Sequence, residues 1–283
     1  MNSTEWKWKT QDGLELFARA WAPDSVARGL VCVVHGLGEH IGRYQAGAEA
    51  LTQAGCILAG FDQRGFGQSE GRKGHTPSLD AYFDDIGRFL EMTMQRYPRL
   101  PTFLYGHSMG AILVLAYTPL HRPPVAGVIA TSPGLKSSIE AQKSKVFLVK
   151  LLGSVFPTLT LQSDIDAQML SRDPHVADAL VNDPLAHTAM TTGWGKALLQ
   201  AIELAYKQAP NFPVPLLLMH GADDLIAYPE GSRIYAALAP KEKLTFKEWE
   251  GFKHELHTDT EKATVFAAMV AWMDEQRVVA AAA

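Results

Sequence analysis

Short apolar runs alternate with segments of helical periodicity along the first half of the chain. Runs rich in Val, Leu, Ile and Phe between turn residues are typical of buried strands, and apolar residues that recur with the period of a helix are typical of helices packed on one side. The predicted strands span residues 14–22, 29–35, 56–61, 102–105 and 125–131. The predicted helices span residues 44–54, 79–97 and 108–120. Strands that alternate with helices form a largely parallel sheet covered by helices, so an α/β fold is predicted.

The alternation stops after Ser132-Pro133-Gly134. The residues that follow have helical periodicity but no convincing buried strand, until the apolar run VPLLLM restores the pattern. A last strand is predicted for LTFKEW, and a last helix at 258–279. We therefore predict a core domain formed by residues 1–134 and 208–283, into which residues 135–207 are inserted as a helical cap.

Residues 106–110, with the sequence GHSMG, fit the pattern G-x-S-x-G. The pattern is weak alone, but here a short strand, TFLY, precedes it and an apolar helical run, AILVLAY, follows it. A strand, a sharp turn and a helix in this order project a serine hydroxyl above a sheet, and the glycines leave room where strand and helix crowd together. A plain glycine-rich turn with an N-capping serine is the alternative. The context favours Ser108 as a nucleophile.

A serine hydroxyl is a weak nucleophile until an imidazole, oriented by a carboxylate, removes its proton. On this kind of sheet the acid and then the histidine follow the serine along the chain. The strand VPLLLM leads into HGADD, which ends at Asp223 and Asp224, and the strand LTFKEW leads into EGFKH, which ends at His254. Only one of the adjacent aspartates can point inward, and we favour Asp224. We favour His254 over His257, which is predicted to begin the last helix in a structural or capping role.

The strand LVCVV leads into the glycine-rich stretch HGLGEH at residues 35–40. In sites of this kind an oxyanion is bound by two backbone N–H groups, one from the residue after the nucleophile and one from the loop after the third strand. Met109 follows the nucleophile, and Leu37 lies in the loop after the strand LVCVV. An ordinary glycine turn is the alternative interpretation of the loop that contains Leu37. His35 and His107 flank the two loops and could hydrogen-bond there.

Charge and cysteine content narrow the possible partners. The net charge is −4, and the acidic and basic residues are interspersed, so the basic stripe that phosphate-backbone binding needs is missing and nucleic acid is not an expected partner. Cys32 and Cys56 each lie in an apolar run, which predicts buried, reduced thiols and suggests no metal site. The first residues contain no apolar stretch of signal-peptide length, so a cytoplasmic location is expected. The proposed chemistry requires no metal or organic cofactor.

Seven stretches of the sequence resemble the monoglyceride lipase family, which also contains bacterial proteins labelled lysophospholipases. They are HGLGEHIGRY (35–44), FDQRGFGQSEGRKGH (61–75), LYGHSMGA (104–111), LSRDP (170–174), NDPL (182–185), MHGADDLI (219–226) and EGFKHELH (250–257). The resemblance implies an α/β-hydrolase fold with a mostly parallel eight-stranded sheet and a cap over the active site. It places the catalytic triad on Ser108, Asp224 and His254 and the oxyanion donors on Leu37 and Met109. It also implies glycerol esters with one acyl chain as substrates.

The predicted cap contains the apolar run VFLVKLLGSVFPTLTL at residues 146–161, in which ten of sixteen residues are Val, Leu or Phe. Lys150 and Pro157 interrupt the run, which is also too short to cross a bilayer. It could pack on the core domain, line an acyl tunnel, or dock transiently on a membrane or micelle surface. Lys143, Lys145 and Lys150 would suit an anionic interface, or could simply form a solvated face.

These observations together predict a serine hydrolase that cleaves carboxylic esters of lipids, most consistently monoacylglycerol to glycerol and a free fatty acid through an acyl-enzyme. The alternatives of the same mechanism are a general carboxylesterase that acts on short-chain or aromatic esters, and a lysophospholipase. Dehalogenases and epoxide hydrolases share the fold but use an aspartate nucleophile, which Ser108 argues against. A non-catalytic binding module is disfavoured because all three triad residues are present. The sequence does not indicate an oligomeric state.

Overall fold

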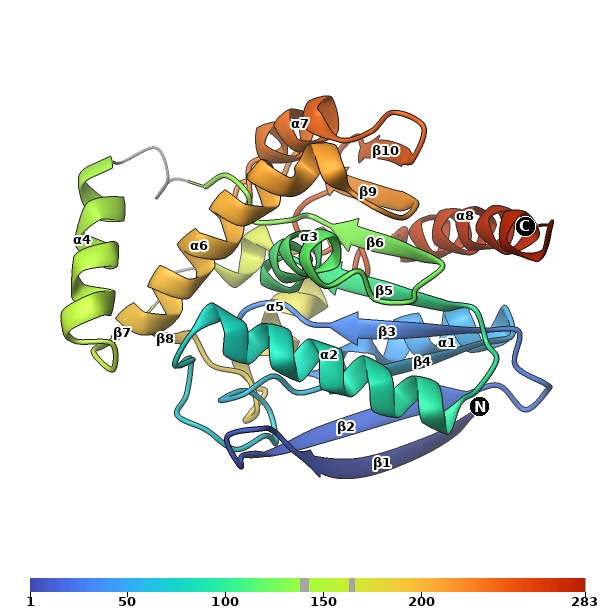
Figure 1. Ribbon diagram of the computed structural model, residues 1–283, viewed down its shortest axis with the longest axis horizontal. Helices are drawn as coiled ribbons and strands as arrows, with labels where there is room; N and C mark the ends of the chain where they lie inside the picture. The colour runs from blue at the N-terminus through green and yellow to red at the C-terminus, as the bar shows by residue number, and fades with distance from the viewer. Residues whose placement is uncertain (138–142, 163–165, 283) are drawn as a thin grey trace.

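The computed structural model describes residues 1–137, 143–162 and 166–282, and its centre is one eight-stranded sheet (Figure 1). Only β2 runs against its neighbours, so the predicted mostly parallel eight-stranded sheet is confirmed. In sheet order the strands are β1 (Asn2–Lys9), β2 (Glu15–Ala22), β4 (Cys56–Phe61), β3 (Gly29–Val34), β5 (Thr102–His107), β6 (Gly127–Thr131), β9 (Leu216–Gly221) and β10 (Leu244–Trp249).

Helices cover both faces of the sheet, and Figure 1 shows α2 and α3 in front of it with α1 and α8 behind. One apolar core lies under α2 (Leu79–Arg96), α3 (Met109–His121), α6 (Thr192–Gln208) and α7 (Pro229–Leu238). A second core lies under α1 (Gln45–Gln53), which follows the short helix η1 (Ile41–Tyr44), and under α8 (Lys262–Ala282). Strands covered on both faces need apolar residues at every position, which is why β3, β4 and β5 are continuous apolar runs in the sequence.

The first strand, β1, was not predicted from the sequence. It pairs only with β2 at the edge of the sheet, and all of its residues except Trp6 and Trp8 are exposed. Trp8 is buried and packs edge-on against Phe61. An edge strand with so few buried positions carries mostly polar residues, so the apolar signal that marks the other strands is too short here.

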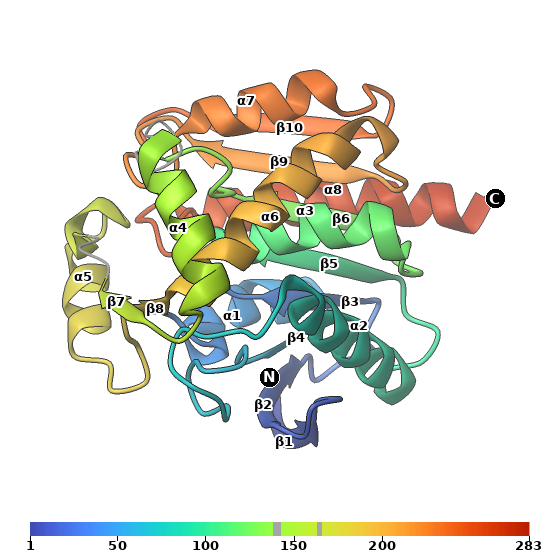
Figure 2. The same cartoon turned by 60° about the vertical axis from the view of Figure 1, so that its left-hand side comes forward.

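The region predicted to be a cap lies beyond the carboxyl ends of β3, β5 and β6 (Figures 1 and 2). It contains α4 (Lys143–Val155), η2 (Ala167–Met169), α5 (Pro174–Val181) and most of α6, so it is largely helical. It also contains two short antiparallel strands that the sequence did not predict, β7 (Thr160–Gln162) and β8 (Ala189–Thr191). The inner face of α6 enters the same apolar core as α3, which anchors this region on the sheet. Another short helix, η3 (Ala209–Asn211), leads back toward the sheet. Within the described ranges, no helix is long and apolar enough to span a membrane.

Candidate active site

Ser108 occupies a strained turn between β5 and α3. Its φ of +52° lies in a region that residues with a side chain rarely adopt, and such a conformation costs about 1–3 kcal/mol. The glycines on either side make the turn possible, since a Cβ at Gly106 would lie 2.4 Å from the carbonyl oxygen of Gly110. A Cβ at Gly110 would lie only 1.9 Å from the carbonyl oxygen of Val34. The strand, the turn and the helix therefore pack at distances that only glycine allows at these two positions.

Three side chains from three loops form one hydrogen-bonded chain. The Oγ of Ser108 lies 2.9 Å from Nε2 of His254, and Nδ1 of His254 lies 2.6 Å from Oδ2 of Asp224. Asp224 follows β9 and His254 follows β10, so both loops lie at the carboxyl edge of the sheet with Ser108. Asp224 is buried, whereas the neighbouring Asp223 is exposed. Of the two aspartates that the sequence offered, the structure brings Asp224 to the histidine.

Asp224 accepts hydrogen bonds on both carboxylate oxygens. The backbone N–H groups of Ile226 and Ala227 donate to Oδ1 over 2.8 and 2.9 Å, while His254 and His220 donate to Oδ2. Burial alone would raise the pKa of Asp224, but the two histidines outweigh it and hold the pKa below its usual value. Burial lowers the pKa of His254, and the Asp224 carboxylate more than offsets this, so the pKa of His254 is raised. The His254 imidazole is therefore a stronger base than an ordinary histidine.

His220 is a contact of Asp224 that the sequence did not single out. Its Nε2 lies 3.1 Å from Oδ2 of Asp224 and 2.8 Å from the carbonyl oxygen of Ala227. Both of these atoms are acceptors, so Nε2 carries the proton, and Nδ1 accepts from the Ser232 hydroxyl over 2.7 Å. His220 thus helps to fix the Asp224 carboxylate, on the same oxygen that His254 contacts. The available signal was its place directly after the apolar run VPLLLM, at the end of a buried strand.

The glycine-rich loop after β3 lies against the serine turn. A Cβ at Gly36 would lie 3.2 Å from the Cβ of Ser108, so the loop that carries Leu37 is in contact with the turn that carries Met109. His35 supports this loop, because its Nδ1 donates to the carbonyl oxygen of Gly36 over 2.8 Å. Its Nε2 accepts from the backbone N–H of Gln63, in the loop after β4. Burial lowers the pKa of His35 to about 3, so the ring is neutral. The prediction that His35 hydrogen-bonds at this loop is confirmed.

Two further buried histidines lie near the site, with the ring of His107 next to His254 and the ring of His257 4.6 Å from that of His107. Nδ1 of His107 lies 3.1 Å from Oγ1 of Thr131, which confirms the predicted hydrogen bonding of His107, and its ring centroid lies 5.1 Å from that of His254. His257 is buried and stacks on Tyr44 at 4.8 Å.

The prediction that His257 begins the last helix is wrong, because α8 begins at Lys262 after a turn. The four residues before α8 have the polar composition of a helix start but form a turn instead.

A strand–turn–helix serine, followed along the chain by an aspartate and a histidine at the same edge of a mostly parallel sheet, defines the α/β-hydrolase fold. Residues 25–261 match the sequence family described as serine aminopeptidase, S33. The chain belongs to this family of serine hydrolases, and it is an enzyme.

Known proteins resemble the chain over nearly its whole length. Human monoglyceride lipase is 33% identical over 279 residues, which cover 96% of this chain and 91% of that protein. The crystal structure of the monoacylglycerol lipase of Paleococcus ferrophilus superposes with a TM-score of 0.84 at 34% identity, over 92% of this chain and 99% of the other. An uncharacterized abhydrolase domain-containing protein of Dictyostelium discoideum is 35% identical over 94% of this chain, which spans only 28% of that protein's length. The resemblance to the monoglyceride lipase family is confirmed.

Proposed function

We propose that this enzyme hydrolyses carboxylic esters of lipids, with monoacylglycerol as the substrate. In this proposal Ser108 is the nucleophile, His254 the general base, and Asp224 the group that orients the base. The backbone N–H groups of Leu37 and Met109 bind the oxyanion. The observation that carries the proposal is the continuous hydrogen-bonded chain from Asp224 through His254 to the Ser108 hydroxyl. The distance from His254 to Ser108 allows proton transfer, and the distance from Asp224 to His254 is that of the hydrogen bond that orients the ring.

The reaction proceeds in two halves. In the first, the Ser108 hydroxyl gives its proton to Nε2 of His254 while Oγ attacks the ester carbonyl carbon, and the carbonyl oxygen becomes an alkoxide held by the two N–H groups. The alkoxide collapses, the bond to the glycerol oxygen breaks, and His254 returns the proton to that oxygen. In the second half, water attacks the acyl-enzyme by the same proton transfers and releases the fatty acid. No electrons are gained or lost overall.

The substrate class rests on the relatives and on the composition of the predicted cap. Human monoglyceride lipase and the Paleococcus ferrophilus monoacylglycerol lipase resemble this chain across almost all of their length. We place the cap at residues 135–207, over the carboxyl edge where Ser108 lies. Because the family description names peptidases, an amide substrate is the competing class that an experiment has to address.

A kinetic panel tests the substrate proposal. It compares monoacylglycerols of increasing acyl length with diacylglycerol, triacylglycerol, a lysophospholipid, short and aromatic nitrophenyl esters, and an aminoacyl anilide. We expect the highest kcat/KM with a monoacylglycerol. A higher kcat/KM with the short esters would support a general carboxylesterase, and a higher value with the lysophospholipid or the anilide would assign the site to that class instead.

The acid limb of the pH profile tests the role of His254. A protonated imidazole cannot accept the serine proton, so kcat/KM falls as the pH drops through the pKa of His254 in the free enzyme. The pKa is raised by Asp224, so we expect the midpoint of this limb above the usual histidine value of about 6.5. Monoacylglycerol has no titratable group, so the limb reports the enzyme alone. A midpoint clearly below the usual value would contradict the proposed pairing.

We further propose that the predicted cap docks transiently on aggregated lipid. Packing of the apolar run 146–161 on the core domain does not account for its large side chains, because most of them are exposed. They are Phe147, Leu148, Leu151, Val155, Phe156, Leu159 and Leu161. Lys150 lies 3.5 Å from Glu203, so its charge is partly matched within the protein, and the side chains of Lys143 and Lys145 lie outside the described residues. The proposal therefore rests on the exposed apolar side chains and not on the lysines.

The cytoplasmic location expected from the sequence stays a prediction.

Replacing Phe147 and Phe156 by serine together tests the docking proposal, since these side chains are 68% and 60% exposed. Loss of two aromatic side chains from the lipid contact should weaken binding to phosphatidylcholine vesicles by about tenfold or more, measured by co-flotation. The KM for emulsified monoacylglycerol should rise, while kinetics on a dispersed short ester stay unchanged. Val26→Ser is the matched control, since Val26 is 95% exposed and precedes β3 at the opposite edge of the sheet. Equal vesicle binding by the double variant and the control would refute the docking.

A further inference from the structure

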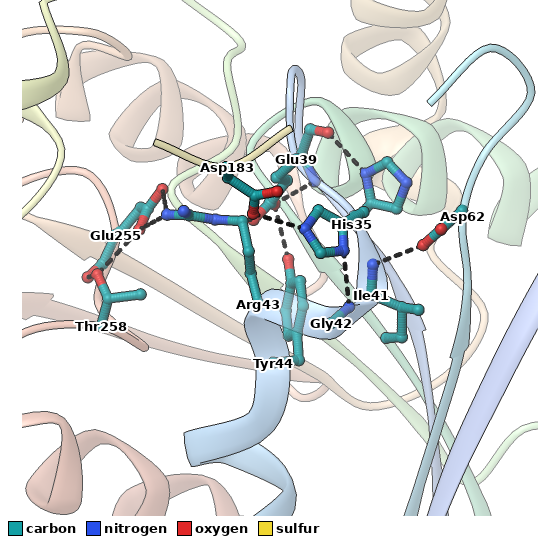
Figure 3. Close-up of polar contacts among 12 residues, drawn as sticks. His35, Glu39, Ile41, Gly42, Arg43, Tyr44, Asp62, Asp183, Glu255 and Thr258 are labelled. Carbon is teal, nitrogen blue, oxygen red and sulfur yellow. Dashed lines mark hydrogen bonds and ion pairs between the residues drawn. The ribbon is translucent and has the colours of Figure 1, made fainter. Parts of the chain in front are cut away.

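Three charged side chains are buried together beside the serine turn, where Figure 3 shows them in a row between two loops. Only 4% of the Glu39 side chain, 9% of Arg43 and 5% of Glu255 is exposed. Removal of three charges from water is unfavourable, and a buried ion pair is often no more stabilising than apolar residues of the same size. A gain in stability is therefore a weak explanation for this cluster. Its position beside the serine turn favours a role in the active site instead.

One end of the cluster holds the glycine-rich loop. Oε1 of Glu39 accepts a hydrogen bond from the backbone N–H of Gly36 over 2.5 Å and another from the Tyr44 hydroxyl over 2.9 Å. Gly36 directly precedes Leu37, so this bond fixes the peptide plane next to the one that carries the Leu37 N–H. The carbonyl oxygen of Gly36 belongs to the Leu37 plane itself, and Nδ1 of His35 holds it over 2.8 Å. The Leu37 N–H is the proposed oxyanion donor from this loop.

The other end of the cluster holds the loop of the proposed base. Nη2 of Arg43 donates to both carboxylate oxygens of Glu255 over 3.2 and 3.1 Å, and Glu255 directly follows His254. The Thr258 hydroxyl donates to the same carboxylate over 2.9 Å. The backbone N–H of Glu255 donates over 2.7 Å to the carbonyl oxygen of Leu170, in the predicted cap. Glu255 thus has its position fixed from several sides.

Arg43, on η1, joins the two ends. Its Nε lies 3.6 Å from Oε2 of Glu39, while its Nη2 binds Glu255, so one guanidinium connects segments that are more than two hundred residues apart in sequence. Burial and the nearby Glu255 raise the pKa of Glu39, and the positive charge of Arg43 opposes this. Arg43 therefore also helps to keep Glu39 in the ionised form that best accepts the Gly36 N–H.

We propose that Arg43 is a positioning residue for the hydrolysis, which sets the oxyanion loop and the His254 loop at a fixed distance through Glu39 and Glu255. This inference rests on the function proposed for Ser108. It predicts that loss of the guanidinium slows the chemical step rather than substrate binding, because the donor and the base would no longer meet the reacting carbonyl together.

The test replaces Arg43 by methionine, which has a similar length and no charge. We expect kcat on monoacylglycerol to fall about 100-fold, as misplacement of catalytic groups by about 1 Å can cause, with little change in KM. The rate of labelling of Ser108 by a fluorophosphonate probe should fall in parallel. Arg43→Lys should recover part of kcat, since it restores the charge without the forked donors.

Arg64→Met is the matched control. Arg64 is also a buried arginine held by two carboxylates, with Nε 2.7 Å from Oδ2 of Asp85 and Nη1 2.8 Å from Oδ2 of Asp12. Its loss should lower the thermal unfolding temperature, as the loss of Arg43 should, but leave kcat unchanged in the folded protein. The proposal is overturned if folded Arg43→Met keeps the kcat of the wild type, if it changes only KM, or if Arg64→Met loses kcat equally.

If Arg43→Met does not fold, Glu255→Gln decides, because the amide keeps the shape and one acceptor oxygen but loses the charge. A lower kcat with unchanged KM supports the proposal, and a kcat equal to that of the wild type overturns it. Failure of the proposed function would be distinct, since the wild type would then lack ester hydrolysis, or Ser108→Ala would retain it.

Discussion

Replacement of Ser108 by alanine is expected to lower kcat for ester hydrolysis by about 10⁶-fold. The variant loses the only atom that can form the acyl-enzyme. The fold should remain, because the Oγ of Ser108 bonds to His254 and the substitution removes that single atom. The measurement is the steady-state rate on monoacylglycerol, with near-ultraviolet circular dichroism and thermal unfolding as checks on the fold.

Ser132→Ala is the matched control for this variant. Ser132 has a positive φ like Ser108, of +45°, and lies just after β6, so the substitution makes the same chemical change on a similar backbone, although Ser132 is buried and Ser108 only partly so. We expect it to retain the activity of the wild type. If Ser108→Ala hydrolyses the ester at the wild-type rate, the assignment of the nucleophile is wrong.

Replacement of Asp224 by asparagine is expected to lower kcat by about 10⁴-fold. The amide cannot accept the Nδ1 proton of His254 with a charged oxygen, so the ring loses both its favoured tautomer and the support of its positive charge. The fall should appear in kcat rather than in KM, because Asp224 is buried behind the histidine. Steady-state kinetics at several pH values measure both quantities.

Asp223→Asn makes the same change one residue earlier, on an exposed side chain. It should behave like the wild type. If Asp223→Asn were the inactive variant, or if Asp224→Asn kept its activity, the orientation of His254 would have to depend on another group. The two adjacent substitutions thus test directly which carboxylate acts on the histidine.

Most of the sheet could be predicted because its central strands are covered on both faces and have to be apolar throughout. The apolar run of β4 matched the observed bounds, Cys56–Phe61. The edge strand β10, Leu244–Trp249, also matched its predicted bounds, although it is only half-covered and carries Thr, Lys and Glu. The edge strand β1 could not be recognised, since only Trp6 and Trp8 of its side chains are even partly covered. The strands β7 and β8 are three residues each, which is too short for a periodic signal.

The loops of the candidate site could be predicted because the carboxyl ends of parallel strands lie at one edge of the sheet, and within these loops Ser108, Asp224 and His254 were favoured. Which side chain turns inward is a matter of local packing, and the structure places Asp224 there; its catalytic role stays a prediction. The contact of His220 with Asp224 and the bridge from Arg43 to Glu255 depend on how distant segments meet. Such contacts cannot be predicted from a local sequence pattern.

Labelling with a fluorophosphonate, followed by digestion and location of the adduct by mass spectrometry, shows whether Ser108 is the nucleophile. We expect one phosphonate, on the Oγ of Ser108, formed in proportion to the loss of ester hydrolysis. A protein that is fully inactivated by an adduct on a different residue, or that remains active with Ser108 fully labelled, would contradict this assignment.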